Sequence, residues 1–288
     1  MLFSSSRLRL LPLLLSVLSL FAQDPPEWRK PFPPFRIIGN VYWVGTYDLS
    51  TYLITTPQGH ILINTGVADT VPLIKIGVEK LGFKISDVKL LTTTQAHADH
   101  VAGFAALKRM TGAKLAIMEP DVEVVETGGK ADFRYRNDPQ ARFEPAKVDR
   151  RLKDGDRISL GGVELTAHLH GGHTKGATSF TFDVREGGKA YKVGIMNMAS
   201  INPGVQVSGM PGFPGIARAY ERTFRNQRAL KIDVFLSSHA IQFNLHDKYK
   251  TGDTYNPERF VDPQGYQEAV ERLERAFREQ LKNESAGR

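Results

Sequence analysis

The segment Gln95-Ala96-His97-Ala98-Asp99-His100 decides the fold, because it places three strong metal-ligand side chains within four residues. It follows the apolar run 88–91, which predicts a buried strand, and it precedes 101–110, which predicts a helix. A loop between a strand and a helix exposes its side chains. Histidine nitrogen and aspartate oxygen are ligands that zinc accepts, so the segment predicts a metal centre.

The spacing within this segment favours two metal positions over one. Neighbouring side chains on a loop diverge, so we do not expect Asp99 and His100 to share a single metal with His97. Two adjacent metal sites accommodate all three ligands more easily.

Two distant histidines lie at comparable strand ends. His173 follows Gly171-Gly172, whose flexible backbone permits a sharp bend, and His239 follows the apolar run 234–236. Taken singly, each is more often a hydrogen-bonded or exposed histidine than a ligand. Taken with the segment 95–100, both are candidate metal ligands.

The remaining histidines give weaker signals. His168 and His170 precede His173 and fit either a strand surface or a supporting position beside a ligand, and His246 has a similar standing on a loop. His60 is expected to be exposed at a hairpin. The chain contains no cysteine, which excludes thiolate ligands and a cysteine nucleophile.

The sequence as a whole predicts one α/β domain with layered architecture, because predicted strands and helices are interspersed along the chain without an interior linker. Periodicity and turn residues predict the following elements: strands in 37–44, 51–55, 60–63, 88–91, 177–184, 190–195 and 232–236, a hairpin over 157–167 about Gly161-Gly162, and helices from about Asp69 to Leu81 and over 101–110, 216–230 and 264–281.

The N-terminus predicts export. Arg7 and Arg9 precede an apolar stretch that ends at Ala22, which is the layout of a signal peptide over residues 1–22. Residues 23–35 follow as a proline-rich arm expected to be extended, and residues 36–288 form the main domain. We therefore expect a periplasmic or secreted protein without a stable membrane anchor.

The charge balance excludes one class of partner. Loss of Arg7 and Arg9 lowers the formal net charge of +7 by two, and much of the remaining surplus lies on the C-terminal helix among glutamates. No basic patch is interleaved with aromatic residues, so we expect no nucleic-acid partner. We expect a monomer that acts on a small molecule.

On these motifs the sequence resembles the metallo-β-lactamases, particularly their third subclass and, within it, the GOB-type enzymes, whose first motif also begins with glutamine. The resemblance covers nearly the whole mature chain. The segments that carry it are Gly45-Thr46-Tyr47-Asp48-Leu49, Leu62-Ile63-Asn64-Thr65-Gly66, the run Gln95 to His100, His173-Thr174-Lys175-Gly176, Ser237-Ser238-His239 and Tyr255-Asn256-Pro257.

The resemblance implies a four-layer αβ/βα sandwich, with two mixed sheets flanked by helices and a metal groove at one edge of the sheets. It implies one or two Zn²⁺ ions per chain. Gln95, His97 and His173 would hold the first, and Asp99, His100 and His239 the second. Gln95 is the weaker member, because an amide oxygen binds zinc less strongly than imidazole.

The implied reaction is the opening of a β-lactam ring by attack of metal-bound hydroxide on the lactam carbonyl, with Asp99 as the catalytic residue that orients or deprotonates water. Ser200, or alternatively Lys175, would receive the substrate carboxylate. Met198 falls where related enzymes place a cysteine ligand or a bridging aspartate, and we expect it to pack instead.

Two alternatives remain open at this point. The first is another hydrolase of the same fold, acting on a thioester or lactone, because a fold does not determine an activity. Against it, the stretch 193–200 contains no aspartate that could bridge two metals. The second is a non-catalytic zinc-binding homologue.

Overall fold

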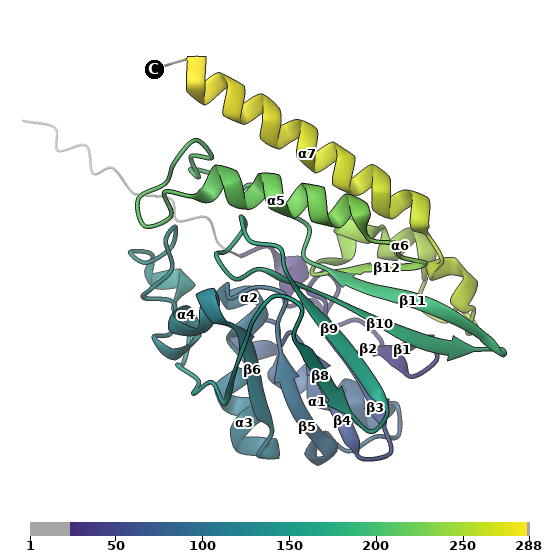
Figure 1. Ribbon diagram of the computed structural model, residues 1–288. Coiled ribbons are helices and arrows are strands. Elements are labelled where there is room, and N and C mark those ends of the chain that lie inside the picture. Colours follow the sequence, from purple (N-terminus) through teal and green to yellow (C-terminus); the bar gives the residue numbers. More distant parts are fainter. Residues whose placement is uncertain (1–23, 287–288) are drawn as a thin grey trace, which may run out of the picture.

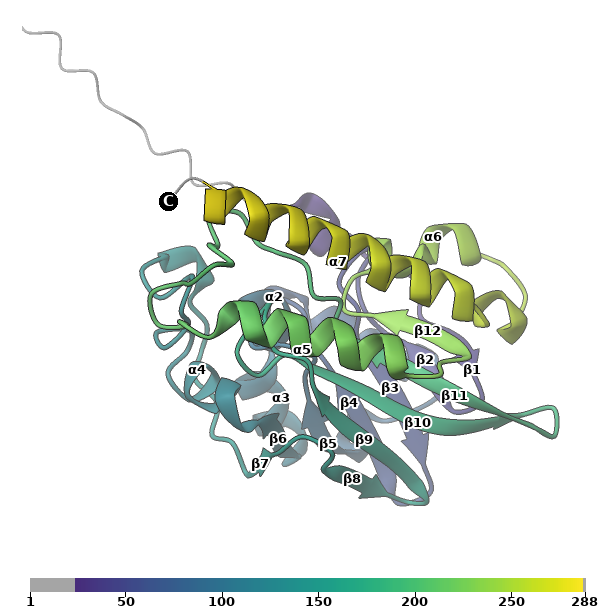
Figure 2. The same ribbon diagram turned by 45° about the horizontal axis from the view of Figure 1, so that its top comes forward.

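The computed structural model describes residues 24–286, so the expected signal peptide at residues 1–22 lies outside the described residues. Two β-sheets pack against each other, and helices cover their outer faces (Figure 1). A second view shows α5 and α7 lying together over one sheet (Figure 2). The expected four-layer αβ/βα sandwich is therefore confirmed.

The first sheet has seven strands in sequence order. β1 to β4 pair antiparallel and β4 to β7 pair parallel, so the sheet is mixed. The strands are β1 (Phe35–Ile38), β2 (Val41–Trp43), β3 (Tyr52–Thr56), β4 (Gly59–Ile63), β5 (Val88–Thr92), β6 (Lys114–Met118) and β7 (Arg150–Leu152).

The second sheet has five strands in the order β12-β11-β10-β9-β8. It is also mixed, because β12 runs parallel to β11 while the other neighbours are antiparallel. The strands are β8 (Arg157–Leu160), β9 (Val163–Leu169), β10 (Thr178–Glu186), β11 (Lys189–Met196) and β12 (Val234–Ser237).

Helices occupy both outer layers. The α-helices are α1 (Val71–Lys80), α2 (Ala98–Val101), α3 (Phe104–Thr111), α4 (Val122–Glu126), α5 (Ile216–Ala229), α6 (Leu245–Lys248) and α7 (Pro263–Ala286). Short 3-10 helices lie between them: η1 (Pro26–Trp28), η2 (Ala68–Thr70), η3 (Ile85–Asp87), η4 (Glu119–Asp121), η5 (Pro139–Ala141), η6 (Ala240–Phe243) and η7 (Pro257–Phe260).

Two hydrophobic clusters hold the layers together. The larger fills the space between the sheets and extends to α5 and α7, where Tyr220, Phe224 and Phe277 are buried. The smaller lies between the first sheet and helices α1 and α3, where Ile74 and Phe104 are buried. Alternate faces of the first sheet therefore serve two cores, which is why its strands are apolar on both sides.

Two segments that the sequence pattern predicts as continuous elements are each interrupted at a glycine. The expected helix over 101–110 is two helices, α2 and α3, that meet at Gly103. A Cβ there would lie 2.6 Å from a Val71 methyl and 2.9 Å from the Thr65 Cβ, so close packing requires glycine. The expected strand run over 37–44 is a hairpin, because Gly39 takes a φ of 53° at the turn between β1 and β2.

The proline-rich arm differs from the expected extended chain. It contains η1, with Pro26 at the first helical position, where no backbone donor is required. Its last residue, Phe35, already belongs to β1. Arg29 anchors the arm through Asp24 at 2.9 Å and Asp69 at 2.7 Å. Between residues 24 and 286, none of the helices is both long and apolar enough to cross a membrane.

Candidate metal centre

The candidate ligands meet because several strands end at the same edge of the two sheets. The loop 93–97 follows β5, the loop 170–177 follows β9 and Ser238-His239 follows β12. The loop 197–204, which carries Ser200, follows β11. The strand-loop-helix setting expected for Gln95 to His100 is confirmed, since α2 begins at Ala98.

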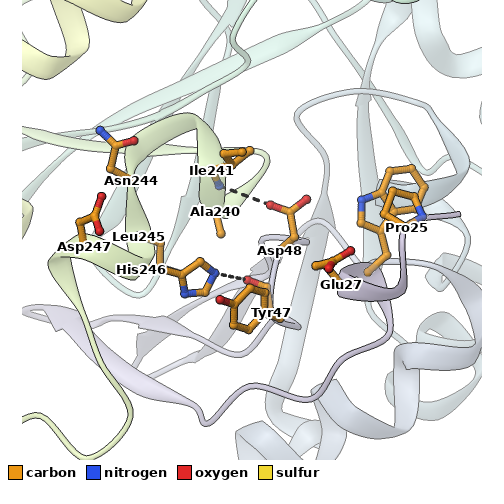
Figure 3. Close-up of a pocket in the computed structure, with 11 residues that line it drawn as sticks. Pro25, Glu27, Tyr47, Asp48, Ala240, Ile241, Asn244, Leu245, His246 and Asp247 are labelled. Atoms are coloured by element: carbon orange, nitrogen blue, oxygen red, sulfur yellow. Dashed lines mark hydrogen bonds between the residues drawn. The ribbon is translucent and has the colours of Figure 1, made fainter.

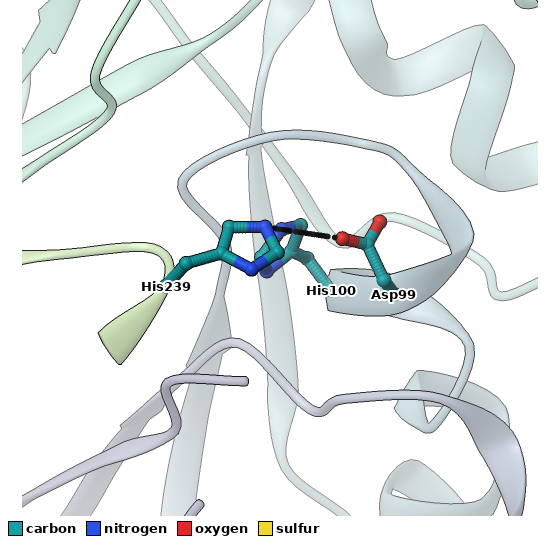
Figure 4. A group of neighbouring side chains, drawn as sticks. All are labelled: Asp99, His100 and His239. Carbon is teal, nitrogen blue, oxygen red and sulfur yellow. Dashed lines mark hydrogen bonds and ion pairs between the residues drawn. The ribbon is translucent and has the colours of Figure 1, made fainter. Parts of the chain in front are cut away.

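Asp99, His100 and His239 form a compact triangle (Figure 4). Asp99 Oδ2 lies 3.0 Å from His100 Nε2 and 3.3 Å from His239 Nε2, and the two histidine nitrogens are 3.2 Å apart. All three side chains are largely buried. Three possible ligand atoms that converge at such distances are the donor set that a divalent zinc ion accepts.

The protonation preferences of this triangle follow from burial and charge. Burial would raise the pKa of Asp99, but His100 and His239 outweigh it and hold the pKa well below the ordinary value. Burial lowers the pKa of His100. Burial would also lower the pKa of His239, but hydrogen bonds to Asp48 and Asp99 raise it to about 9.

Asp48 orients His239 from behind. Its Oδ2 accepts a hydrogen bond from His239 Nδ1 at 2.9 Å, and its Oδ1 accepts one from the Ile241 backbone N–H at 3.3 Å. Because the Asp48 carboxylate accepts from Nδ1, His239 keeps its proton on Nδ1 when the ring is neutral, and its lone pair is then on Nε2, toward Asp99. A carboxylate that holds a histidine in this manner is the usual support of a zinc ligand.

The second group of candidates contains Gln95, His97 and His173. The rings of His97 and His173 lie 4.9 Å apart between centroids. Gln95 is buried, and its Oε1 accepts a hydrogen bond from Asn197 Nδ2 at 3.0 Å. The structure thus brings these three residues to the same edge, with the glutamine oxygen already engaged by a protein partner.

His97 and His173 also have partners on their outer sides. Asp132 Oδ2 lies 3.6 Å from His97 Nε2, and burial of His97 is outweighed by this carboxylate, which raises the histidine pKa. His173 Nδ1 donates to the Ser200 backbone carbonyl at 2.9 Å. A carbonyl only accepts, so the lone pair of His173 lies on Nε2. Burial and the nearby His97 lower the pKa of His173 to about 3.

Asp121 ties the two metal-ligand loops together. It accepts hydrogen bonds from the Ala96 N–H at 3.2 Å, the Thr174 hydroxyl at 2.6 Å and the Gly176 N–H at 2.6 Å. The carboxyl is buried, and burial raises its pKa to about 6. The loop of Gln95 to His100 is therefore held to the loop of His173 by one side chain.

The candidate ligands open into a groove of about 630 Å³. The arm forms one wall, because Asp24, Pro25 and Trp28 line the groove, and the Trp28 ring lies 6.0 Å from the His239 ring. Arg134, Tyr135 and Ser200 also line the groove. A smaller pocket of about 350 Å³ shares Pro25 and Trp28 with the groove, and Asp48 lines it (Figure 3).

The other sequence candidates have structural partners away from the triangle. His168 bonds Thr181 at 2.8 Å, His170 bonds Ser179 at 2.7 Å and His246 bonds the Tyr47 carbonyl at 2.9 Å. His60 was expected to be exposed, and this is wrong: it is buried against Phe83. The hairpin places it at the start of β4, under the loop that follows α1.

Two further expectations concern residues beside the groove. Met198 is buried in the larger core, as expected for a packing residue. Lys175 is not among the residues that line the groove in the described part of the chain. Ser200 does line it, with Oγ 3.2 Å from His173 Nδ1.

Several site residues were not identified from the sequence. Asp121 follows the apolar run of β6, so the same strand-end signal that selected 95–100 could have found it. Asp48 was noted only within a family motif, and Asp132, Tyr135 and Trp28 carry no local signal. Their contacts arise from distant segments that only the fold brings together.

Comparisons with known proteins agree with this geometry. The sequence profile described as Metallo-beta-lactamase superfamily matches residues 45–186. A β-lactamase from Chitinophaga pinensis is 44% identical, with a TM-score of 0.88 over 92% of this chain and 100% of that chain. GOB-18 from Elizabethkingia meningoseptica, a metallo-β-lactamase, is 41% identical, with a TM-score of 0.88 over 97% of this chain and 100% of that chain.

A third structure carries a more specific description. LRA-12 from an Alaskan soil metagenome, a class B3 di-zinc metallo-β-lactamase, is 43% identical, with a TM-score of 0.87 over 90% of this chain and 98% of that chain. Among curated proteins, a hydroxyacylglutathione hydrolase of Rhodopseudomonas palustris is 28% identical over 132 residues. That match spans 46% of this chain and only 42% of the relative.

Proposed function

Because the chain belongs to the metallo-β-lactamase superfamily and resembles class B3 structures along nearly its full length, we propose that it is a zinc-dependent hydrolase that opens the β-lactam ring of antibiotics. The observation that carries the proposal is the convergence of Asp99, His100 and His239 beside a groove large enough for a small molecule, which Asp99 and His239 line. The expected resemblance to the third subclass is confirmed.

We propose the metal ligands that the family resemblance implies, and the triangle of Asp99, His100 and His239 supports one of the two sets. Asp99, His100 and His239 would hold one zinc, and Gln95, His97 and His173 the other. Asp48 accepts a hydrogen bond from His239 Nδ1, which holds the proton on the nitrogen that faces away from the metal. Asp132 lies 3.6 Å from His97 Nε2, close enough to support that ring by charge. Zinc bound by these residues would supply Lewis-acid chemistry, which lowers the pKa of water toward neutrality and offsets developing negative charge.

Asp99 is the proposed catalytic residue. It is ionised, and its Oδ2 faces the two histidines, which leaves Oδ1 available to orient the attacking water and accept its proton. The new C–O bond forms at the lactam carbonyl and the C–N bond breaks. The proton then passes to the ring nitrogen, which leaves as an amine.

Ser200 is placed to receive the substrate carboxylate. Its backbone carbonyl accepts from His173, and its hydroxyl lies on the same side of the groove. The hydroxyl can therefore donate to an anion while the backbone of the same residue positions a metal ligand. The same residue would thus orient both the substrate and the metal ligand His173.

A second candidate function is the hydrolysis of a thioester such as an acylglutathione, because several curated relatives are hydroxyacylglutathione hydrolases. The site favours the first candidate. The position available for a bridging aspartate holds Met198, whose side chain is buried in the core. A non-catalytic zinc-binding protein is disfavoured by the groove of about 630 Å³ beside the candidate ligands, because structural zinc sites are closed whereas catalytic ones keep an open position.

We further propose export to the periplasm or medium after removal of residues 1–22, followed by the arm at 23–35 and the hydrolase domain at 36–288, and a monomeric state. Intact-mass analysis of exported protein tests the processing site. A mature mass that retains Arg7 and Arg9 would contradict it.

The substrate assay separates the candidate functions. Zinc-loaded protein is given a chromogenic cephalosporin, an acylglutathione thioester and a lactone in parallel. We expect sustained opening of the cephalosporin and turnover of the other two at least 100-fold slower in kcat/KM. Preference for the thioester or lactone, or no turnover of any of the three, would overturn the proposal.

A further inference from the structure

Arg134 is the only lysine or arginine among the described residues that line the metal groove. It lies on the segment between α4 and β7 and is half-buried. The chain carries 38 lysine and arginine residues, and only Arg134 among them lines the groove, so the groove holds one fixed guanidinium rather than a basic patch.

The guanidinium is fixed by contacts on three sides. Its Nε donates to the Pro203 carbonyl at 2.9 Å, and its carbon lies 5.0 Å from the centroid of the Tyr135 ring. A Cβ at Gly204 would lie 3.0 Å from the terminal nitrogen Nη2, so the guanidinium fork packs closely against the backbone at Gly204. Gly204 also takes a φ of 79°, which favours glycine independently.

The terminal nitrogens of this fork have no hydrogen-bond or ion-pair partner among residues 24–286. The acidic side chains that line the groove are Asp24, Asp99 and Asp138, and none forms an ion pair with Arg134. Asp99 is engaged by His100 and His239, and Asp24 by Arg29. An anchored guanidinium with free donors is a receptor for a planar anion.

We propose that Arg134 binds the carboxylate of the substrate as a specificity-determining residue. This inference rests on the proposed hydrolase function. The bond to Pro203 joins Arg134 to the loop that carries Ser200, three residues earlier. Arg134 supplies the charge and Ser200 a hydrogen bond, so the groove selects substrates that carry an anion beside the scissile ring.

The test compares a chromogenic cephalosporin with its methyl ester, which lacks the anion. In the zinc-loaded protein we expect Arg134→Gln to lower kcat/KM for the free acid about 10–100-fold, mainly through KM, because a charge-assisted bond is lost. The ester should change less than threefold. A loop that is merely loosened would slow both substrates equally, so equal losses, or no loss for the acid, would overturn the proposal.

Two variants serve as controls. Arg136→Gln removes the same charge from the same loop outside the groove lining and should leave the ratio of acid to ester rates unchanged. Arg134→Lys keeps the charge without the fork and should recover part of the discrimination. A ratio that changes as much in Arg136→Gln as in Arg134→Gln would contradict a specific contact.

Binding separates this inference from the proposed function. The cephalosporin is opened chemically with base, and its affinity for the zinc-loaded protein is measured by calorimetry. If the wild type opens neither substrate, the proposed function fails, but Arg134 is still tested. At least tenfold weaker binding by Arg134→Gln than by Arg136→Gln supports the anion receptor. Equal binding, or no binding by the wild type, overturns it.

Discussion

Asp48 positions the candidate zinc ligand His239 from outside the groove. Its carboxylate accepts a hydrogen bond from His239 Nδ1 at 2.9 Å, and Asp48 itself lines the neighbouring smaller pocket. We expect Asp48→Ala to lower the affinity of the Asp99 site for zinc about 10–100-fold, because His239 loses the partner that fixes its tautomer and orientation. Competition with a coloured chelator measures this directly, without reference to activity.

The control for Asp48 is Asp247→Ala, which removes another carboxylate from the same neighbouring pocket but touches no candidate ligand. It should leave zinc affinity unchanged. Asp48→Asn keeps an acceptor for His239 Nδ1, so its zinc affinity should lie between those of Asp48→Ala and Asp247→Ala. Wild-type affinity in Asp48→Ala would refute the positioning role.

Gln95 makes the two metal positions unequal. Its Oε1 is a weaker ligand than imidazole and already accepts a hydrogen bond from Asn197 at 3.0 Å, which withdraws electron density from the oxygen and weakens it further as a zinc ligand. We expect the site of Asp99, His100 and His239 to fill first in a calorimetric titration. Gln95→His should tighten the weaker site, and two equally tight sites in the wild type would contradict the ordering.

At the scale of elements, Asp121 joins the start of α2 to the loop after β9. We expect Asp121→Ala to lower the free energy of unfolding by at least about 3 kcal/mol, because three buried donors lose their acceptor. Urea unfolding of the chelated protein measures it. Glu119→Ala, an exposed change in the same 3-10 helix, should stay within about 0.5 kcal/mol. A similarly small loss of unfolding free energy in Asp121→Ala would show that its hydrogen bonds do not stabilise the two loops.

Much of the fold could be predicted from local signals. Apolar runs and turn glycines located α1, α5, α7 and the hairpin of β8 and β9 to within a few residues. The break at Gly103 could not be predicted, because its cause is contact with Thr65 and Val71, which are distant in sequence. β6, β7 and α4 were missed, since short elements give little periodic signal.

The site divides in the same way. Histidines and Asp99 were identified because ligand chemistry limits the residue types and they cluster at strand ends. Asp48, Asp132 and Arg134 were not, because aspartate and arginine are common on surfaces and acquire meaning only through neighbours far away in the chain. His60 shows the converse: a hairpin position looked exposed until Phe83 packed over it.

For the molecule as a whole, acid stability depends on buried His170. Burial, with the nearby His168 and Arg222, lowers the pKa of His170 to about 3, while in the unfolded chain it is about 6.5. Between these values the unfolded state binds one more proton, so stability is lost as pH falls below about 6.5, at about 1.4 kcal/mol per pH unit.

His170→Gln removes this titration. Relative to the variant, the chelated wild type should lose about 2 kcal/mol of unfolding free energy between pH 7.5 and pH 5.0. Urea unfolding at the two values measures the difference, and using metal-free protein excludes proton competition at the ligands. A difference between the proteins that stays constant with pH would mean that His170 is protonated normally in the fold.

The central claim is that zinc held between the two ligand segments carries out hydrolysis, and one titration tests it most directly. Cephalosporin turnover is followed as zinc is returned to chelated wild type, Asp99→Ala and His246→Ala. We predict no turnover after chelation, recovery with added zinc in the wild type and His246→Ala, and at least a 100-fold loss in Asp99→Ala. Turnover that survives chelation, or near-normal rates in Asp99→Ala, would contradict the account.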